Sequence, residues 1–331
     1  MEPVVSVIIP AYNTEGYIEQ AIQSALDQTW RNLEVVVVDD GSTDGTVAVV
    51  QSMAEDRVKL FKNARNMGVG ATRNRAIQES QGQWIAVLDS DDWYAPERLE
   101  RLVHFAQETG ADMVADDLHI VEDGHAEPRT TLLAWSGDGA NLTQPIQVSA
   151  VDFVQSDIEN QKGLKLGFSK PMFKRQFLFD HGVAYRPEIT VSQDFWIDLD
   201  CLVQGATFWL LPEPYYYYRS REGALTTSTK ITLRLDQECE VIAQFMADQQ
   251  SYLATNPDLA EALTFKLRET AKYRDYYRVV ERMKGKEYAQ AMAQVSAYPA
   301  FIAVLLQRFP GILNRRLQTL LHKDSVYYKF N

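Results

Sequence analysis

Residues 84–96, WIAVLDSDDWYAP, join a buried apolar run to a cluster of acids. Asp89, Asp91 and Asp92 place three carboxylates within four positions, and like charges this close repel one another unless something neutralises them. A calcium loop of the EF-hand type is excluded, because counting from Asp89 puts Tyr94 where that loop requires glycine. The stretch is then either a solvated turn or a site for Mg²⁺ or Mn²⁺, held by two carboxylates in Asp-x-Asp spacing and by substrate phosphates.

Apolar, β-branched runs alternate with helical patterns on both sides of this stretch. We expect strands in the runs at residues 4–12, 33–40, 57–63, 84–92 and 111–118. We expect helices between them, at residues 14–29, 46–54, 68–81 and 95–110. Pro10 should end the first strand, and Thr14 is the expected N-cap of the first helix. The alternation predicts right-handed crossovers, a mostly parallel sheet and an α/β nucleotide-binding fold over the first 120 residues.

Several polar residues follow directly after these expected strands. In open α/β sheets, ligands bind beyond the carboxyl ends of the strands. Side chains that are distant in sequence should therefore meet at one edge of the sheet, and those we expect there are Tyr12, Asp39, Asp40, Asp89 and Asp91. By contrast, residues 122–150 are rich in Gly, Thr, Asp and Pro, which predicts an exposed insertion or lid.

Composition narrows the class of protein. The chain has 331 residues, of which 46% are hydrophobic and 24% charged, as in ordinary globular proteins. Its two cysteines lack metal-ligand spacing, it has no signal-peptide pattern, and no window reaches the roughly 20 apolar residues of a membrane span. We therefore expect a soluble, cytoplasmic protein.

The charge is distributed unevenly along the chain. Residues 264–331 carry 13 Lys/Arg against 5 Asp/Glu, or +8, so the first 263 residues carry 20 against 40, or −20. An acidic body of this kind excludes nucleic acid as its partner, because phosphate requires a basic face. Two interpretations of the basic, partly apolar tail at residues 298–330 remain open. It either rests on the anionic inner face of the cell membrane, or forms helices that pack on the core or across a homodimer.

Four motifs in order resemble a known family: VSVIIPAYN, VVVVDDGSTDGT, NARNMGVGATRNRAI and WIAVLDSDDWYAPERLE. Together they resemble the inverting nucleotide-sugar glycosyltransferases of family 2, which have a GT-A fold. The match covers residues 4–105 and continues, with weaker motifs, to about residue 228. It is most similar to the bacterial exopolysaccharide glucosyltransferases of the succinoglycan type. We accordingly expect a GT-A-like catalytic domain at 1–229, with a nucleotide-sugar half at 1–120 and an acceptor half at 121–229, and a helical C-terminal region at 230–331.

The resemblance implies a donor site for a UDP-sugar and a divalent metal. Asp39 would accept the uracil N–H; the alternative is a helix N-cap or a turn residue. Asp91 would bind Mn²⁺ or Mg²⁺ directly, and Asp89 would contact the metal or the ribose. The other residues that the resemblance places at the donor are Pro10, Ala11, Tyr12, Arg73, Arg219 and Arg221, the last two beside the diphosphate.

The acceptor side is expected in the motif VSQDFWID. Asp194 matches the general base, which removes the proton of the acceptor hydroxyl, although it could instead be a helix N-cap. Gln193 replaces the glutamate that is common in the family, and Lys170 is expected beside the acceptor. The implied function is transfer of a sugar, with glucose as the first candidate, to a glycan or lipid-linked saccharide in polysaccharide biosynthesis. Nucleotidyl transfer and a non-catalytic binding role are the alternatives.

Overall fold

The computed structural model describes residues 4–137, 139–159, 161, 163–190, 192–221, 230–298 and 301–308. By their contacts, the residues divide into two compact units, which we describe separately. The first comprises residues 1–157 and 162–221, and the second comprises residues 158–161 and 222–331. The domain division at residue 229 that the sequence suggests stays a prediction.

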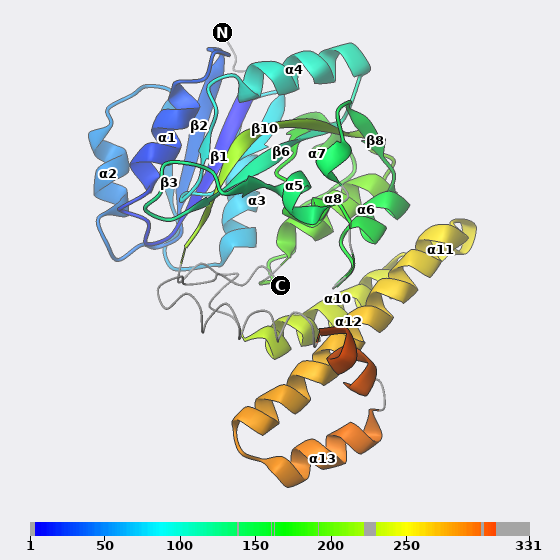
Figure 1. The fold of residues 1–331 in the computed structure, drawn as a ribbon. Coiled ribbons are helices and arrows are strands. Elements are labelled where there is room, and N and C mark those ends of the chain that lie inside the picture. Colours follow the sequence, from blue (N-terminus) through cyan, green and yellow to red (C-terminus); the bar gives the residue numbers. More distant parts are fainter. Residues whose placement is uncertain are drawn as a thin grey trace. The chain divides into compact units, whose positions relative to one another are not determined.

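The first unit is built on one large sheet (Figure 1). Its strands are β1 (Val5–Ala11), β2 (Leu33–Asp39), β3 (Val58–Lys62), β4 (Trp84–Val87), β5 (Trp93–Tyr94), β6 (Met113–Glu122), β7 (Thr130–Thr131), β8 (Ile146–Val148), β9 (Met172–Lys174) and β10 (Phe208–Ser220). Every residue of β1 and β2 is buried, which explains why these strands are apolar at successive positions.

The strand order is β3-β2-β1-β4-β9-β6-β10-β5. Strands β3, β2, β1 and β4 are parallel to one another. Short β9 runs antiparallel to both β4 and β6, so β6, and β10 beside it, again point the same way as β1. The mostly parallel sheet is therefore confirmed, and its antiparallel members are the short strands β5, β7, β8 and β9.

Helices of the first unit flank this sheet (Figure 1). They are α1 (Ile18–Leu26), α2 (Thr46–Ser52), α3 (Val69–Glu79), α4 (Arg98–Thr109), α5 (Leu132–Ser136), α6 (Ala150–Ser156), α7 (Arg175–Asp180) and α8 (Gln193–Val203), with 3-10 turns at Gly139–Asn141 and Leu166–Phe168. The face of α1 that packs on the sheet carries Ile18, Ile22 and Leu26 at the spacing of one helical stripe. The α/β fold class is thus confirmed.

Two boundaries near the first strand differ from those that the sequence predicts. Pro10 does not end β1, which continues to Ala11; β4 pairs with β1 only as far as Ile8, so the strand has an unpaired side there that tolerates a missing N–H. Thr14 is not the N-cap of α1, because the helix begins after Tyr17. The Thr14 N–H instead donates to Oγ1 of Thr46 at 2.8 Å, which ties the loop to the next helix.

Residues 122–150 do not form a simple exposed loop. Strand β7 pairs with β6, and β8 pairs with β10, so the segment adds strands to the sheet at two places. Leu132, Leu133 and Val148 are buried. Leu132 and Leu133 stand in one short apolar cluster and Val148 stands between polar residues, so the sequence shows no clear period from which to predict the strands.

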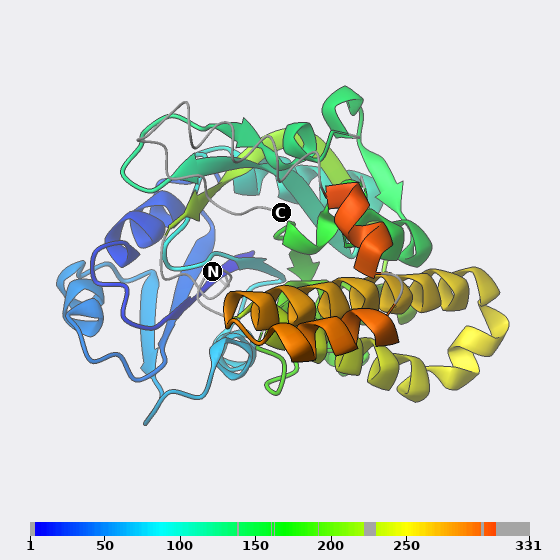
Figure 2. The ribbon, with the colours of Figure 1, turned by 60° about the horizontal axis from the view of Figure 1, so that its bottom comes forward.

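The second unit is helical, as the pattern beyond residue 230 predicts. Its helices are α10 (Ile231–Asp248), α11 (Gln250–Thr255), α12 (Pro257–Lys284), α13 (Tyr288–Ala297) and a last helix at Phe301–Arg308. Helices α10 and α12 lie side by side (Figure 2). Leu235 of α10, Tyr273 and Tyr276 of α12 and Val304 of the last helix form one buried apolar cluster.

No single helix in the described ranges has the length and apolar character to cross a membrane. Helix α13 and the helix at residues 301–308 pass that test only when joined, and they are bent by 104° at the break between them. Most of the basic tail, residues 309–331, lies outside the described residues, so membrane contact through this tail stays a prediction.

Candidate active site

The carboxyl ends of three adjacent parallel strands form the edge at which the sequence predicts the site. Strand β1 lies between β2 and β4, so Tyr12, Asp39 and Asp89 follow neighbouring strands. The Asp40 N–H donates to the carbonyl of Ala11 at 2.8 Å, which closes this edge. Pro10 and Ala11 are buried beneath it, whereas the Tyr12 side chain is 46% exposed and available for stacking.

At this edge, the Asp39 carboxylate has one oxygen that is available to accept a hydrogen bond from a ligand. Its Oδ2 accepts from the N–H groups of Gly41 and Ser42, each at 3.2 Å. Its Oδ1 is buried and has no hydrogen-bond partner among the described residues. Gly41 has a φ of +77°, and a Cβ there would meet the Arg65 backbone at 3.0 Å, so the turn that shapes this acceptor requires glycine. Burying a polar atom without a partner is unfavourable, which makes Oδ1 a candidate for a ligand's N–H.

Asp40, by contrast, is fully used in shaping the site. Its Oδ1 accepts from Nδ2 of Asn63 at 2.7 Å and from the Met67 N–H at 2.9 Å. Its Oδ2 accepts from the Gly68 N–H at 2.9 Å. Asp40 therefore fixes the loop that leads into α3.

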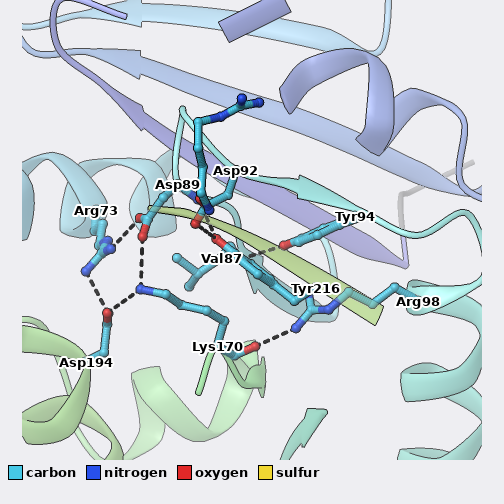
Figure 3. A network of polar contacts seen from close by, with 10 residues as sticks. Arg73, Val87, Asp89, Asp92, Tyr94, Arg98, Lys170, Asp194 and Tyr216 are labelled. Atoms are coloured by element: carbon cyan, nitrogen blue, oxygen red, sulfur yellow. Dashed lines mark hydrogen bonds and ion pairs between the residues drawn. The ribbon is translucent and has the colours of Figure 1, made fainter. Parts of the chain in front are cut away.

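Four charged side chains close a ring at the centre of the site (Figure 3). Arg73 donates through Nη2 to Oδ1 of Asp89 at 2.5 Å and through Nη1 to Oδ1 of Asp194 at 2.7 Å. Lys170 Nζ lies 2.9 Å from Oδ2 of Asp89 and 2.5 Å from Oδ2 of Asp194. The signs alternate around this ring, so each charge has two opposite neighbours. We call these four residues the charge ring.

Each member of the charge ring lies on a different helix or loop of the first unit. Arg73 belongs to the buried stripe of α3, with Gly70, Ala76 and Ile77, where an apolar residue would be usual. Asp194 lies in the first turn of α8, a position where the helix dipole favours an acid. Asp89 follows β4, and Lys170 precedes β9. The ring therefore joins residues that are up to 121 positions apart.

The electrostatics of the charge ring favour the ionised forms of Asp89, Arg73 and Lys170. Burial alone would raise the pKa of Asp89, but the charges of Lys170 and Arg73 outweigh it and hold the pKa well below its ordinary value. Burial also opposes the charge on Lys170 and on Arg73, yet the Asp194 and Asp89 carboxylates raise the pKa of both. The two cations are almost fully enclosed, with side-chain exposures of 5% and 7%.

Asp92 holds the acidic loop in place. Its Oδ2 accepts from the Tyr216 hydroxyl, and its Oδ1 accepts from the Arg219 N–H, both at 2.7 Å. The Tyr216 oxygen also accepts from the Asp89 N–H at 3.2 Å. Burial raises the pKa of Asp92, and the charges of Asp91 and Asp89 add to this effect. A buried acid of this kind is suited to fixing a loop rather than to binding a substrate.

Asp91 meets the two arginines at the end of β10. Its Oδ2 accepts from Nε of Arg221 at 2.6 Å, and its carbonyl accepts from Nε of Arg219 at 2.7 Å. Both guanidinium groups also lie over the Tyr17 ring, at 5.1 Å for Arg219 and 5.0 Å for Arg221. The structure thus brings these predicted diphosphate ligands to the predicted metal ligand.

Comparison with known proteins identifies the family. The model of glycosyl transferase family 2 matches residues 6–178, which is more than half of the chain. The chain belongs to glycosyltransferase family 2. A succinoglycan biosynthesis protein, ExoO of Rhizobium meliloti (strain 1021), is 32% identical over 98% of this chain and 90% of its own length. The family and the kinship with succinoglycan biosynthesis proteins are therefore both confirmed.

Solved structures of glycosyltransferases share the fold. TarS residues 1–349 from S. aureus, in complex with UDP-GlcNAc, align with a TM-score of 0.61 and 20% identity over 90% of this chain and 92% of that chain. The mannosyltransferase PcManGT from Pyrobaculum calidifontis, in complex with GDP-Man and Mn²⁺, aligns with a TM-score of 0.54 and 18% identity over 97% and 88%. At these identities the likeness establishes the GT-A fold alone.

A divalent metal fits this glycosyltransferase at Asp91. Both oxygens of Asp89 are already paired with Arg73 and Lys170, whereas the carboxylate contact of Asp91 found among the described residues uses Oδ2, which is paired with Arg221. Within the described ranges, no group of three or more Asp, Glu, His or Cys side chains is arranged so that it could hold a metal ion. Mg²⁺ and Mn²⁺ do not need such a cluster, because one carboxylate with substrate phosphates and water is a usual ligand set. A metal at Asp91 therefore stays a prediction, and Asp89, which the sequence also predicts at the metal, has both carboxylate oxygens paired within the charge ring.

The sequence does not predict the full set of contacts of three residues of this site. Lys170 is expected beside the acceptor, and it contacts Asp194 of the predicted acceptor side, but it also contacts Asp89. Tyr216 is one of four consecutive tyrosines, and nothing in that run distinguishes it. The amide of Gln193 donates to the carbonyl of Ile189, so its side chain supports the loop before α8.

The pH dependence of stability tests the charge ring. Because the folded-state pKa of Asp89 lies below its ordinary value of 3.8, its ionised form stabilises the fold above that value, and the contribution is lost as the pH falls below it. We expect Asp89→Asn to lower the free energy of unfolding by roughly 2 kcal/mol at pH 7, and by much less near pH 3. Urea unfolding of both proteins between pH 7 and pH 3 measures this difference. Asp56→Asn, at an exposed position, is the control, and a gap that stays constant over the range would contradict the assignment.

Proposed function

We propose that this glycosyltransferase is a metal-dependent inverting enzyme that moves a sugar from a UDP-sugar to a saccharide acceptor. The observation that carries the proposal is the position of Asp194 next to Asp89, with Arg73 and Lys170 bridging the two carboxylates. Asp89 belongs to the acidic loop on the donor side, and Asp194 comes from a helix 105 positions later in the chain. A base beside the donor is what a single displacement at the sugar C1 requires.

The proposed reaction is one displacement without a covalent enzyme intermediate. The acceptor hydroxyl donates a hydrogen bond to the Asp194 carboxylate, and its oxygen attacks C1 from the face opposite the diphosphate. As the new C–O bond forms, the proton passes to Asp194 and the C1–oxygen bond to the diphosphate breaks, which releases UDP. A carboxylate has about four acceptor sites, so Asp194 can receive this hydroxyl while Arg73 and Lys170 remain bound.

Cations at the end of β10 would stabilise the leaving group. Arg221 and Arg219 both lie against Asp91, beside which we place the diphosphate, and Arg219 is also paired with Asp123 at 3.1 Å. A metal bound at Asp91 would add charge neutralisation of the phosphates at the same place. Arg221 could then exchange its contact with Asp91 for one with a phosphate oxygen.

We propose that Asp39 recognises the uracil base of the donor. The buried, unpaired Oδ1 suits the N3–H of uracil, whereas cytosine presents a lone pair at N3 and would leave the carboxylate opposed by another acceptor. We expect Asp39→Ala to weaken UDP binding by roughly 10- to 100-fold, since hydrogen bonds to charged groups contribute about 1.5–3 kcal/mol. Binding of CDP should change little. Calorimetry with both nucleotides measures this, and an equal preference for UDP and CDP in the unaltered protein would remove Asp39 from this role.

The acceptor is proposed from the relatives. ExoO is described as a succinoglycan biosynthesis protein, so a growing glycan, free or lipid-linked, is the proposed acceptor in polysaccharide biosynthesis. UDP-glucose is the first donor to test.

A lipid-linked acceptor would require the enzyme to work at a membrane surface. The basic tail would supply the contact, through cations such as Arg315, Arg316 and Lys323. We expect the full chain to float with vesicles that contain phosphatidylglycerol but not with pure phosphatidylcholine, and a variant with these three cations changed to Glu to stay in the soluble fraction with both. Equal flotation of the two proteins would exclude a role for the tail.

A screen of nucleotide-sugars tests the function as a whole. The protein is incubated with UDP-, GDP- and CDP-sugars and saccharide acceptors, in Mn²⁺, in Mg²⁺ and in EDTA. The proposal predicts release of UDP and formation of a glycoside of inverted anomeric configuration, with a metal present. Release of pyrophosphate, retained configuration, or turnover in EDTA equal to that in metal would each contradict a stated part of it.

A further inference from the structure

The core of the first unit contains an ion pair that solvent does not reach. Arg98 is the first residue of α4, Asp116 lies on β6, and their side chains are 0% and 1% exposed. The guanidinium donates twice, from Nη2 to Oδ1 at 2.7 Å and from Nε to Oδ2 at 3.0 Å. Enclosing two charges costs several kcal/mol per ion, and replacing such pairs by apolar side chains of similar volume is often neutral or stabilising. Stability alone therefore does not account for this pair.

Three further contacts of the Arg98 side chain lead toward the active site. Its Nη2 also donates to the main-chain carbonyl of Lys170 at 2.6 Å, so it holds the backbone of a charge-ring residue. Its Cζ lies 4.3 Å from the ring centre of Tyr94 and 5.2 Å from that of Tyr216. Figure 3 shows Arg98 reaching toward Lys170 and Tyr216 from the side opposite the charge ring.

The two tyrosines in turn hold the acidic loop. The Tyr94 hydroxyl donates to the carbonyl of Val87, the last residue of β4, at 2.6 Å. The Tyr216 hydroxyl donates to Asp92 and accepts from the Asp89 N–H. One guanidinium group thus contacts the support of the loop that carries Asp89 and Asp91 and also the support of Lys170.

We propose that Arg98, oriented by Asp116, is a positioning residue that fixes the spacing between the acidic loop and Lys170. Because the Arg98 side chain is 0% exposed, it has no surface for direct contact with a substrate or a metal. Its effect passes through Tyr216 on one side and through the Lys170 backbone on the other, so a shift of the guanidinium moves both parts of the charge ring. Displacement of catalytic groups by about 1 Å can cost roughly 100-fold in rate. This inference rests on the proposed function, because the spacing matters to sugar transfer.

The experiment removes the ion pair without leaving a lone buried charge. In the variant Arg98→Met with Asp116→Leu, both partners become apolar, so we expect cooperative urea unfolding with a midpoint close to that of the unaltered protein. We expect kcat for sugar transfer to fall about 100-fold and KM for the donor to change less than about threefold. The control is Lys266→Met with Glu238→Leu, which removes another enclosed ion pair, 3.4 Å apart, in the second unit and should leave kcat unchanged. A folded Arg98/Asp116 double variant with unaltered kcat, or an equal loss in the control, would overturn the proposal.

A second measurement does not depend on activity. Lys170 is enclosed and bound to two carboxylates, so brief acetylation with acetic anhydride should modify it slowly. Mass spectrometry should show faster modification of Lys170 in the Arg98/Asp116 variant and not in the control; an unchanged rate would overturn the proposal even if no sugar were transferred. Absence of transfer by the unaltered protein would instead contradict the proposed function. Should the double variant not fold, Arg98→Lys serves for both measurements, since it keeps the charge but cannot make the paired contacts of a guanidinium.

Discussion

Asp194→Asn should reduce kcat by roughly 10²–10⁴-fold while the affinity for UDP changes less than about threefold. The amide retains the size of the carboxylate and can still accept from Arg73 at the position of Oδ1. It cannot take up the proton of an acceptor hydroxyl, so the displacement would have to proceed without a base. Donor binding should survive, because the residues proposed to hold the nucleotide lie on other elements, at Tyr12, Asp39 and Arg221.

Steady-state release of UDP and calorimetric binding of UDP separate these two effects. Asp198→Asn is the matched control, since Asp198 lies one turn later on the same helix and is fully buried. Burial, reinforced by the charge of Asp194, raises the pKa of Asp198 well above its ordinary value, and neither of its carboxyl oxygens has a hydrogen-bond partner among the described residues. An amide of the same size at this position breaks none of the described contacts and should change kcat less than about threefold. Full turnover by Asp194→Asn, or an equal loss in Asp198→Asn, would place the base elsewhere.

Asp91→Ala should abolish the dependence of UDP binding on a divalent metal. In the unaltered protein we expect Mn²⁺ to tighten UDP binding by about 10- to 100-fold, because the metal links a carboxylate to phosphates that would otherwise repel it. Without the Asp91 carboxylate the cation has no protein ligand in the acidic loop, since Asp89 is held by Arg73 and Lys170. Sugar transfer should then fall by at least about 100-fold.

Calorimetry of UDP with Mn²⁺ and with EDTA measures this effect. Arg221→Gln is the comparison, because it removes the partner of Asp91 but leaves the carboxylate in place. That variant should bind UDP more weakly in both conditions while its response to Mn²⁺ persists. If Asp91→Ala responds to Mn²⁺ as the unaltered protein does, the metal is held by other residues.

The fold of the first unit could largely be predicted from sequence, for a physical reason. Strands covered on both faces must be apolar at successive positions, and β1 and β2 follow this pattern along their whole length. Parallel strands also end at a common edge, so residues directly after them meet whatever their distance in the chain. Tyr12, Asp39 and Asp89 are therefore predictable at one edge of the sheet from the sequence alone.

The charge ring and its support could not be derived in this way. Lys170 stands before the three-residue strand β9, whose antiparallel insertion between β4 and β6 leaves no periodic pattern in the sequence. Arg98 occupies a buried position of α4, although an arginine in a helical pattern predicts an exposed side chain. Arg73 interrupts the apolar stripe of α3 in the same manner. Cations in such positions become interpretable only when the carboxylates opposite them are located in space.

The closed arrangement of Arg73, Asp89, Lys170 and Asp194 has a consequence for natural variation. The four charges sum to zero, so loss of a single member leaves an unbalanced charge in an enclosed place. If one of the two aspartates and one of the two cations are both replaced by neutral residues, the sum of the charges is again zero. Homologues that diverge here should therefore differ at two of these positions together, and an aligned set of their sequences should show correlated substitutions among all four.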